Sequence, residues 1–158
     1  MQQTLILLKP DAVQRRLVGD ITHRFERKGL RLVGLKLLTV PRELAEKHYA
    51  VHKGKPFYES LLSFLTSGPA VAMVWEGREA VAVCRNLMGL TDGAKAPPGT
   101  IRGDFAHTSK GYTEAQHKVA ANLIHASGNV EEAKYEVELW FSAEELHDYQ
   151  TLAEKYTF

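Results

Sequence analysis

Short apolar runs alternate along the chain with stretches in which apolar residues recur at helical spacing, and proline, glycine or acidic residues separate them. The runs are rich in Leu, Ile and Val, a composition typical of buried β-strands. We expect strands at residues 4–8, 30–40, 70–75 and 123–125. The last run is the shortest, and it ends on His125 before the small residues Ala126, Ser127 and Gly128.

The intervening stretches predict amphipathic helices, because apolar side chains at helical spacing line one face. The clearest stripe predicts a single helix with Asp11 as N-cap and Gly29 as C-cap, and it comprises Val13, Leu17, Ile21 and Phe25. Further helices are expected at residues 42–52, 57–65, 78–88 and 130–141. The remaining long segments, 89–103 and 106–121, show no clear period, and loops of that kind often carry function.

The coarse order β-α-β-α-β-α-β-α over 158 residues fits one domain with a sizeable hydrophobic core. It favours an α/β (α+β) fold of the ferredoxin-like type, a βαββαβ sandwich in which a four-stranded antiparallel sheet has helices packed on one side. A doubly wound parallel sheet has a similar order of elements. The connecting segments alone do not separate the two folds.

The composition is that of an ordinary globular protein, with 44% apolar and 25% charged residues. The single cysteine, Cys84, excludes an intrachain disulfide and favours a reducing, cytoplasmic location. No apolar run reaches the roughly 18 residues of a membrane span, and the N-terminus lacks the layout of a signal peptide. We therefore expect no membrane partner.

Charge is nearly balanced overall, at +1, which argues against nucleic acid as the main partner. The charge is unevenly spread, however. Residues 9–36 carry eight Lys or Arg against three Asp or Glu, and residues 126–158 carry eight acids against two lysines. Solvated helix faces are the simplest explanation of this distribution. The alternative is that the basic residues form a surface that binds polyanionic ligands such as phosphates.

Several familiar nucleotide and metal motifs are missing from the sequence, among them the P-loop, G-x-G-x-x-G after the first strand, C-x-x-C and H-E-x-x-H. A nucleotide-using protein of this sequence would therefore hold phosphates with side chains. Lys9, Arg85 and Arg102 lie at or near the ends of expected elements, and an arginine fork matches phosphate oxygens well. The glycines on both sides of Arg102 are expected to leave room for a ligand. For each cation, a surface ion pair is the plainer alternative.

His125 is the candidate nucleophile. A histidine is more often structural or exposed than catalytic, but this one ends an apolar strand, precedes small residues and is followed by an acidic helix. An imidazole whose far nitrogen is held by a carboxylate is a competent nucleophile. At this point the orienting carboxylate is open between Glu131, Glu132, Glu136 and Glu138.

The most specific pattern in the chain is a series of short segments: Lys9–Arg15, Lys55–Phe57, Ser67–Pro69, Met73–Gly77, Pro98–Phe105 and Asn122–Ser127. In this order and at nearly this spacing, they resemble the signatures of the nucleoside diphosphate kinase family. Each segment alone is a modest signal, and together they extend the resemblance nearly from end to end. The resemblance implies a ferredoxin-like fold and a single kinase domain over residues 1–158.

It also implies an activity, namely transfer of the γ-phosphate of a nucleoside triphosphate, mainly ATP, to nucleoside diphosphates by a ping-pong mechanism through a phosphohistidine on His125. The family carries Mg²⁺ on the nucleotide phosphates, with no metal ligand from the chain, and forms homo-oligomers, either tetramers or hexamers. Glu136 matches the carboxylate that orients the histidine, and Tyr49 matches a residue packed near it. The positions that match substrate contacts are Lys9, Arg85, Thr91 and Arg102 for phosphates, Phe57 for the base and Asn122 for the sugar.

Two features depart from the family pattern. Gly128 and Asn129 replace an Asp and its neighbour, and the segment 106–121 is longer than in the common form. The missing carboxylate is the one reason to consider a catalytically silent nucleotide-binding subunit of the same fold, and nucleic-acid binding by residues 9–36 is a third hypothesis. The tail is expected either to form a subunit interface or to pack on its own subunit, through Tyr149, Leu152, Tyr156 and Phe158.

Overall fold

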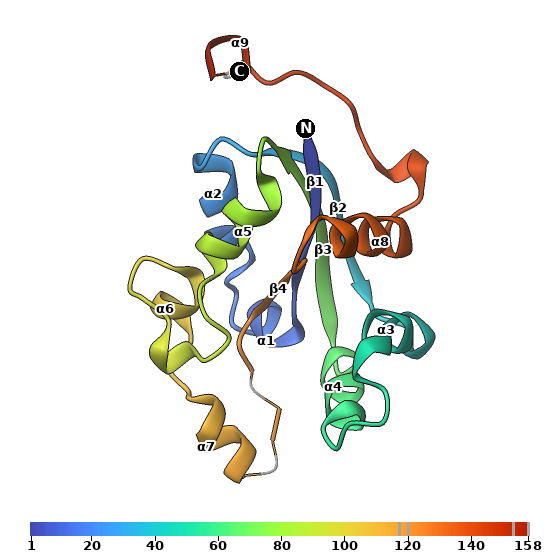
Figure 1. Cartoon of the computed structure of the whole chain (residues 1–158), viewed down its shortest axis with the longest axis vertical. Coiled ribbons are helices and arrows are strands. Elements are labelled where there is room, and N and C mark those ends of the chain that lie inside the picture. The colour runs from blue at the N-terminus through green and yellow to red at the C-terminus, as the bar shows by residue number, and fades with distance from the viewer. Residues whose placement is uncertain (117, 120, 153, 158) are drawn as a thin grey trace.

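The computed structural model describes residues 1–116, 118–119, 121–152 and 154–157. Its strands form one sheet in the order β2-β3-β1-β4 (Figure 1). They are β1 Gln2–Leu8, β2 Arg31–Thr39, β3 Pro69–Gly77 and β4 Ile124–Ala126. Every neighbouring pair is antiparallel, which confirms the ferredoxin-like arrangement and excludes the parallel doubly wound sheet.

Helices cover both faces of the sheet, so the expectation of helices on one side was wrong (Figure 1). Helices α2 and α5 pack on one face, and α3 and α8 pack on the other. The reason lies in the strands, because β3 is buried at every residue after Pro69 and neither of its faces can stay in water. The helical elements are α1 Pro10–Gln14, α2 Val18–Arg27, α3 Arg42–His48, η1 Ala50–His52, α4 Tyr58–Leu65, α5 Ala80–Met88, η2 Gly93–Lys95, α6 Ile101–Phe105, α7 Lys110–Ala115, α8 Val130–Trp140, η3 Ala143–Glu145 and α9 Glu154–Thr157.

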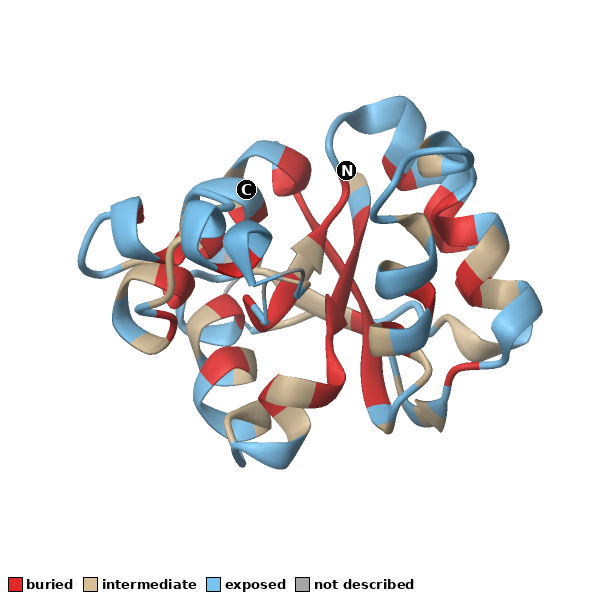
Figure 2. Cartoon of the chain, turned by 90° about the horizontal axis from the view of Figure 1, so that it is seen from below, coloured by how far each residue is buried: buried red, intermediate tan, exposed pale blue. Residues whose placement is uncertain are grey.

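Strand β1 divides the core into two clusters, because successive side chains of a strand point to opposite faces. Ile6 and Leu8 pack with α2 and α5, whereas Leu5 and Leu7 pack with α3 and α8. All four side chains are fully buried, and Figure 2 shows this burial along the strands. Each buried side chain of this size contributes roughly 1.5–3 kcal/mol. Strand β1 therefore stabilises both halves of the molecule.

The apolar stripe that predicted one helix after β1 forms two helices, α1 and α2. The chain turns between them at Arg16, whose φ of 59° lies in the left-handed region and interrupts the helix. The prediction of Asp11 as N-cap was also wrong. Lys9 occupies the N-cap position, and the Asp11 carboxylate instead accepts a hydrogen bond from the distant backbone amide of Leu123.

Gly29 comes directly after Lys28, the C-cap residue of α2, so the sequence placed this helix end to within one residue. Its φ is +87°, a conformation that costs other residues energy. Its amide donates to the carbonyl of Glu26 at 2.9 Å, and the amide of Leu30 donates to the carbonyl of Phe25 at 3.3 Å. This pair of hydrogen bonds is the Schellman motif, which satisfies the last carbonyls of the helix.

The segments without a clear period contain short capped helices. The Thr100 side chain accepts a hydrogen bond from the amide of Gly103 at 3.0 Å and so begins α6. The Ser109 side chain accepts from the amide of Tyr112 at 3.1 Å and begins α7. These helices are too short to show an apolar period, so only their caps mark them in the sequence.

The acidic tail packs along the outer edge of β2 and pairs with basic side chains there. Arg31 lies 3.0 Å from a carboxylate oxygen of Asp148, and Lys36 lies 2.7 Å from one of Glu145. The hydroxyl of Tyr149 donates to a backbone carbonyl of β2 at 2.7 Å. Part of the uneven charge distribution is therefore pairing within the chain. For these residues, neither solvated helix faces nor a phosphate-binding surface was the explanation.

The apolar residues of the tail behave differently from one another. Tyr149 is hydrogen-bonded to β2 of the same chain, whereas Leu152 and Tyr156 are 91% and 84% exposed. Phe158 lies outside the described residues. Cys84 is buried in α5, and burial raises the pKa of its thiol to about 12. Within the described ranges, the chain has no helix with both the length and the apolar character needed to cross a membrane.

Two exposed glycines of the α2 region test the backbone argument, since they differ in φ. Gly19 lies inside the helix with open space around it, so Gly19→Ala is expected to raise the free energy of unfolding by about 0.5–1 kcal/mol. At Gly29, where φ is +87°, the same change is expected to lower it by about 1 kcal/mol. Urea denaturation measures both values. Effects of the same sign would contradict the role of Gly29 as helix terminator.

Candidate active site

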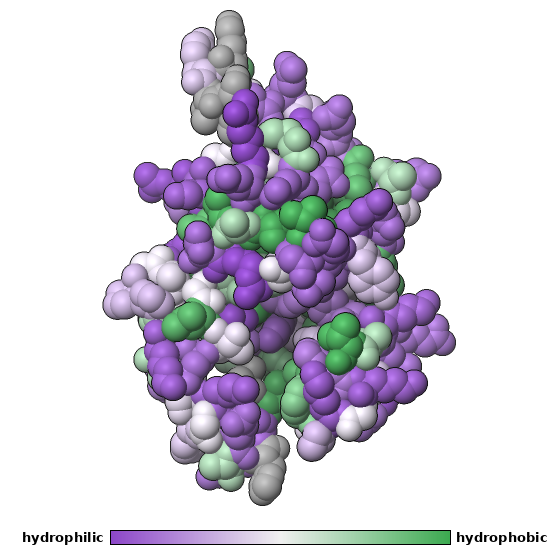
Figure 3. Space-filling model, viewed as in Figure 1, coloured by the Kyte–Doolittle hydropathy of each residue, from purple (hydrophilic) through white to green (hydrophobic). Residues whose placement is uncertain are grey.

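A cleft of about 660 Å³ opens beside β4, between the α6–α7 side of the molecule and the α3–α4 side (Figure 3). This volume is sufficient for a drug-sized ligand. The cleft brings together residues that the sequence singled out in distant segments, namely Lys9, Phe57, Arg85, Thr91, Arg102, Asn122 and His125. Glu136 lies behind His125 on α8.

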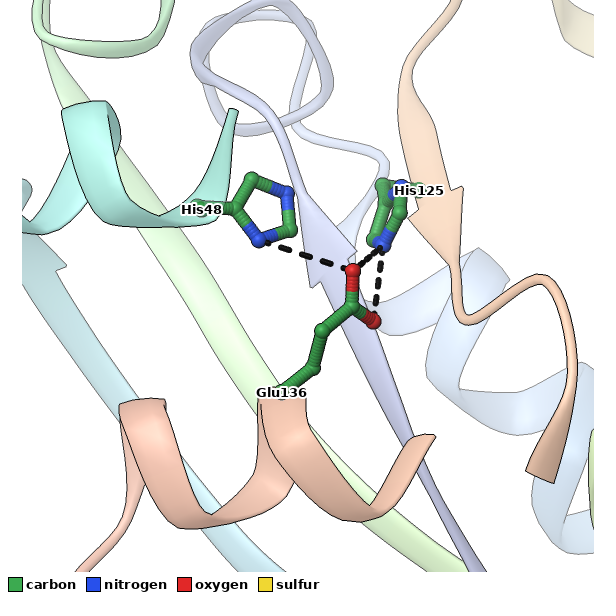
Figure 4. Close-up of side chains that lie close together, drawn as sticks. All are labelled: His48, His125 and Glu136. Carbon is green, nitrogen blue, oxygen red and sulfur yellow. Dashed lines mark hydrogen bonds and ion pairs between the residues drawn. The ribbon is translucent and has the colours of Figure 1, made fainter. Parts of the chain in front are cut away.

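The register of β4 decides which way His125 faces. His125 pairs with Leu7 of β1, and partners on neighbouring strands share a face of the sheet. Leu7 faces α8, so the imidazole meets Glu136 from that helix (Figure 4). The flanking residues Ile124 and Ala126 belong to the core on the opposite face.

The hydrogen bonds of His125 select one tautomer. Its Nε2 lies 2.8 and 3.0 Å from the two carboxylate oxygens of Glu136, which is buried. The Ser127 hydroxyl donates to the same carboxylate at 2.6 Å. A carboxylate only accepts hydrogen bonds, so Nε2 carries the proton and Nδ1 keeps its lone pair. No described residue hydrogen-bonds to Nδ1, which leaves this lone pair for a ligand.

Of the four acidic residues that the residue pattern left open, the structure places Glu136 on the imidazole. Glu136 shares the buried face of α8 with Ala133, Val137 and Trp140. A single carboxylate on an otherwise apolar helix face is a signal that the sequence contained, because a buried charge requires a partner. Glu132 bonds the turn before α8 instead.

His48, which the sequence analysis did not select, packs beside this pair. Its ring is perpendicular to that of His125, with centroids 4.6 Å apart, and Trp140 Nε1 donates to its Nδ1 at 3.3 Å. Burial lowers the pKa of His48 well below its ordinary value, and repulsion from His125 and Lys9 lowers it further. His48 is therefore neutral, and its approach to Glu136 at 3.6 Å is not an ion pair.

The possible metal-ligand atoms of His48, His125 and Glu136 lie within 4.8 Å of one another, which is close enough to share a metal ion. His48 Nδ1, His125 Nε2 and the Glu136 carboxylate already have hydrogen-bond partners in the protein, so we assign the cluster to histidine positioning. Tyr49 packs against His48 with ring centroids 4.7 Å apart. Burial raises the pKa of the Tyr49 phenol to about 12, so its hydroxyl stays protonated at neutral pH.

Lys9 and Arg102 place two buried cations in the cleft. Lys9 Nζ donates to Asn122 Oδ1 at 2.7 Å. Burial lowers the pKa of Lys9 to about 8, and repulsion from Arg102 contributes to this shift. Burial likewise lowers the pKa of Arg102 to about 10, and repulsion from Arg85 contributes. A bound anion would offset both effects, so the cleft is electrostatically suited to a polyanionic ligand.

The Arg102 guanidinium also has a structural role. It donates to three backbone carbonyls, from Nε to Asn122 at 3.1 Å, from Nη1 to Gly89 at 3.3 Å and from Nη2 to Ile124 at 2.5 Å. Arginine has five N–H groups, so two remain for a ligand. The prediction that both flanking glycines leave room for a ligand was wrong at Gly103, where a side chain would collide with a backbone carbonyl of the same loop.

The rim of the cleft is more open than its interior. Phe57 is 47% exposed, and its ring centroid lies 5.6 Å from that of His52. Arg85 is exposed and donates to the carbonyl of the last residue of β4 at 3.3 Å. The carbonyl of Thr91 accepts from Asn122 Nδ2 at 2.9 Å. The Phe57 ring and the exposed residues Arg85 and Thr91 therefore lie at the entrance of the cleft.

The turn after β4 is bound by a carboxylate from α8 even though position 128 is glycine. The Glu132 carboxylate accepts from the amide of Gly128 at 2.9 Å and from Asn129 Nδ2 at 3.0 Å. The Asn129 side chain caps α8 by accepting from the amide of Glu132 at 2.8 Å. A Cβ at position 128 would require the flexible end of the Glu132 side chain to shift. The three residues therefore fit one another as a set.

Known proteins are similar to this chain over almost its whole length. The family model described as nucleoside diphosphate kinase matches residues 2–146. A nucleoside diphosphate kinase of Carboxydothermus hydrogenoformans is 53% identical over 150 residues, which are 95% of this chain and 94% of that protein. One from Thermomicrobium roseum is 51% identical over 156 residues, 99% of this chain and 98% of that protein.

Solved structures give the same result for the fold. A nucleoside-diphosphate kinase from Borrelia burgdorferi, a transition-state mimic with bound vanadate and ADP, has a TM-score of 0.93 and 40% identity, over 97% of this chain and 94% of that one. A halophilic nucleoside diphosphate kinase from Halobacterium salinarum in complex with CDP has a TM-score of 0.89 and 44% identity, over 99% and 98% of the two chains.

Lys9→Met tests the free-energy cost of the buried charge. The pKa of Lys9 is about 8 in the folded protein and 10.5 in the unfolded chain, so the unfolded state binds more protons between these values and wild-type stability rises with pH there. Below pH 8 the protonated side chain costs up to about 3 kcal/mol. The variant is therefore expected to be more stable than the wild type at pH 7, by a margin that shrinks as pH rises from 8.

Urea denaturation at a series of pH values measures this margin. Lys95→Met is the matched control, because the Lys95 side chain is 76% exposed and its removal is expected to leave the pH dependence unchanged. A difference between Lys9→Met and wild type that stays constant from pH 7 to pH 10 would contradict the shifted pKa of Lys9.

Proposed function

The chain belongs to the nucleoside diphosphate kinase family of phosphotransferases, and we propose that His125 carries the phosphate between its two substrates. In this proposal the γ-phosphate of a nucleoside triphosphate, mainly ATP, moves first to Nδ1 of His125 and then to a nucleoside diphosphate. The observation that supports it best is the geometry of the imidazole. Glu136 holds Nε2, and Nδ1 has no hydrogen-bond partner among the described residues around a cleft lined by cations.

The two half-reactions need no separate general base. The Nδ1 lone pair of His125 attacks the γ-phosphorus, a P–N bond forms, and the bond from phosphorus to the bridging oxygen breaks. The nucleoside diphosphate leaves with the electron pair of that bond. Nε2 keeps its proton, and the Glu136 carboxylate stabilises the positive charge that develops on the ring. In the second half-reaction a terminal oxygen of another diphosphate attacks the phosphorus and the P–N bond breaks.

The phosphates bind, in this proposal, to Lys9, Arg85, Thr91 and Arg102. Phosphoryl transfer requires mainly positioning and stabilisation of charge, which these side chains supply. Lys9 has a pKa of about 8 and is mostly protonated at neutral pH before any ligand binds. The two N–H groups of Arg102 that the backbone does not use are available to phosphate oxygens.

In this proposal the base binds at the rim of the cleft, and the sugar binds further in, where Lys9 and Asn122 are buried. Stacking on Phe57 is insensitive to base identity because every base has a π-face. Asn122 and Lys9, which are hydrogen-bonded to each other, bind the ribose hydroxyls in this proposal. Two structural neighbours hold CDP and ADP, a pyrimidine and a purine nucleotide. A stacking site that does not read base edges would accept both kinds.

Mg²⁺ is carried, we propose, on the nucleotide phosphates. The ion prefers several oxygen ligands and often takes them from phosphates. The cations Lys9, Arg85 and Arg102 fit phosphate oxygens rather than a metal, and the Glu132 carboxylate is bound to the turn before α8. When bound, the ion shields the charge of the phosphates. The chain would hold the nucleotide and thereby the ion.

The remaining part of the proposal is a homo-oligomer, either a tetramer or a hexamer, in the cytoplasm. Strand β2 is at the edge of the sheet, and two of its side chains, Leu35 and Leu37, are 53% and 63% exposed. Exposed apolar side chains on an edge strand favour contact with another copy. The buried thiol of Cys84 fits a reducing compartment.

Incubation with γ-labelled ATP is expected to put an acid-labile, base-stable phosphate on His125. The label is expected to move to added GDP or CDP, since the phosphoenzyme is an intermediate. His125→Ala is expected to lose the label and to lower turnover by about 10⁴-fold or more. His23→Ala is the control, because this exposed histidine lies on α2 away from the cleft, and it should retain both label and activity.

Wild-type turnover by His125→Ala would overturn the phosphohistidine mechanism. Nucleotide binding by the wild type without any phosphoenzyme would instead favour the catalytically silent subunit. That hypothesis rested on the missing Asp at position 128, and the Glu132 carboxylate of α8, which is hydrogen-bonded to that residue, weakens its only support.

Light scattering of the purified wild type is expected to give the mass of four or six chains of 17.7 kDa each. Replacing Leu35 and Leu37 together by Lys is expected to lower this mass by weakening the edge contact. Leu90→Lys is a matched control, because Leu90 is similarly exposed, at 55%, but lies outside the sheet. A monomeric wild type at micromolar concentration would refute the oligomer.

A further inference from the structure

The residue two positions before His125 has a backbone conformation that its own chemistry does not favour. Leu123 has a φ of 70°, in the region that side-chain-bearing residues rarely adopt, and its apolar side chain is fully buried. The amide of Ile124 donates to the carbonyl of Asn122 at 2.8 Å across it. A hydrogen bond between residues i and i+2 with positive φ at the centre defines a strained γ-turn. Such a turn persists only where surrounding contacts enforce it.

The contacts that enforce this turn come from the start of α1. The Asp11 carboxylate accepts from the amide of Leu123 at 3.0 Å, although the two residues are 112 positions apart. The amide of Lys9 donates to the carbonyl of Leu123 at 2.8 Å. Both backbone polar groups of the strained residue are therefore bound by the segment that carries Lys9 and Asp11.

On the other side, Arg102 binds the neighbours of the strained residue. Its guanidinium donates to the carbonyls of Asn122 and Ile124 at 3.1 and 2.5 Å. These are the carbonyls immediately before and after Leu123. Of the groups that hold the turn, the Asp11 carboxylate is the one that accepts from its central amide.

The Asp11 carboxylate also acts on the charged groups of the cleft. Its negative charge raises the pKa of Lys9 and of Arg102, opposing the effect of burial on each. One of its oxygens, Oδ1, is buried and has no hydrogen-bond partner among the described residues. Burying a carboxylate oxygen without a hydrogen-bond partner costs free energy, and favourable interactions of Asp11 with the nearby cations and the turn offset that cost.

We propose that Asp11 is a positioning residue for the phosphotransfer, because its hydrogen bond to the amide of Leu123 holds the γ-turn that aims His125 at the cleft. The inference rests on the proposed function of His125. Without the acceptor, the buried amide of Leu123 loses its partner and the residue relaxes towards negative φ. That rotation displaces the chain entering β4, and small displacements of a reacting group reduce rates strongly.

Two substitutions separate the hydrogen bond from the charge. Asp11→Ala removes both, and kcat is expected to fall about 10- to 100-fold while KM for ATP stays within about threefold. Asp11→Asn keeps an oxygen that accepts from the Leu123 amide, and its kcat is expected to stay within about threefold of wild type. Asp20→Ala, an exposed carboxylate on α2, is the matched control and is expected to leave both constants unchanged.

Single-turnover labelling of His125 by ATP measures the affected step directly, and urea denaturation shows that each variant is folded at the assay temperature. If Asp11→Ala does not fold, hydrogen exchange of the wild type provides the test, since the Leu123 amide is expected to be protected. Rapid exchange of that amide, wild-type labelling by Asp11→Ala, or equal loss in Asp11→Asn and Asp11→Ala would each overturn the proposal. These results are distinct from failure of the proposed function, in which wild-type His125 itself takes no label.

Discussion

The burial of two cations, Lys9 and Arg102, is the physical constraint on which the site depends. For Lys9, a fall in pKa from 10.5 to about 8 corresponds to about 3 kcal/mol of unfavourable free energy at neutral pH. Native domains are stable by only about 5–15 kcal/mol, so this is a large fraction of the total. The fully buried side chains on both faces of β1 offset the cost. In return, the cleft holds positive charge that the nearby Asp11 carboxylate only partly offsets, and phosphate oxygens are its natural complement.

The pairing of β1 with β4 positions the side chains of the site relative to these cations. Because Leu7 pairs with His125, the imidazole faces α8 and reaches Glu136, while Lys9, two residues after Leu7, reaches the chain just before β4. A shift of one residue in this register would turn His125 into the opposite core. Nucleophile, orienting carboxylate and cation are thus fixed by one strand pair.

Strain is part of the same arrangement. A residue such as Leu123, with a φ of 70°, costs on the order of 1–3 kcal/mol. Of the groups that hold it, Lys9 and Arg102 line the cleft, and the Asp11 carboxylate raises the pKa of both. Charge, strain and position are therefore coupled, and a substitution at one of these residues is expected to act on the others. Additive interpretation of single variants would fail within this cluster.

The sequence by itself determined whatever depends on near neighbours. Apolar runs marked the strands, Gly29 marked the end of α2 through its backbone freedom, and His125 attracted attention as a histidine between an apolar strand and small residues. The family resemblance, carried by short segments, supplied the fold and the kinase activity that the comparisons then showed. Each of these signals is contained within a few residues, where propensity and capping chemistry operate.

Only the tertiary structure decided how distant groups share their bonds. It put helices on both faces of the sheet, assigned Glu136 to the imidazole and Glu132 to the turn, and bound Asp11 to Leu123 instead of to its own helix. It also committed three N–H groups of Arg102 to backbone carbonyls. The reason is physical, because a buried donor or acceptor takes the partner that the packed chain brings within about 3 Å, and local pattern does not encode that partner.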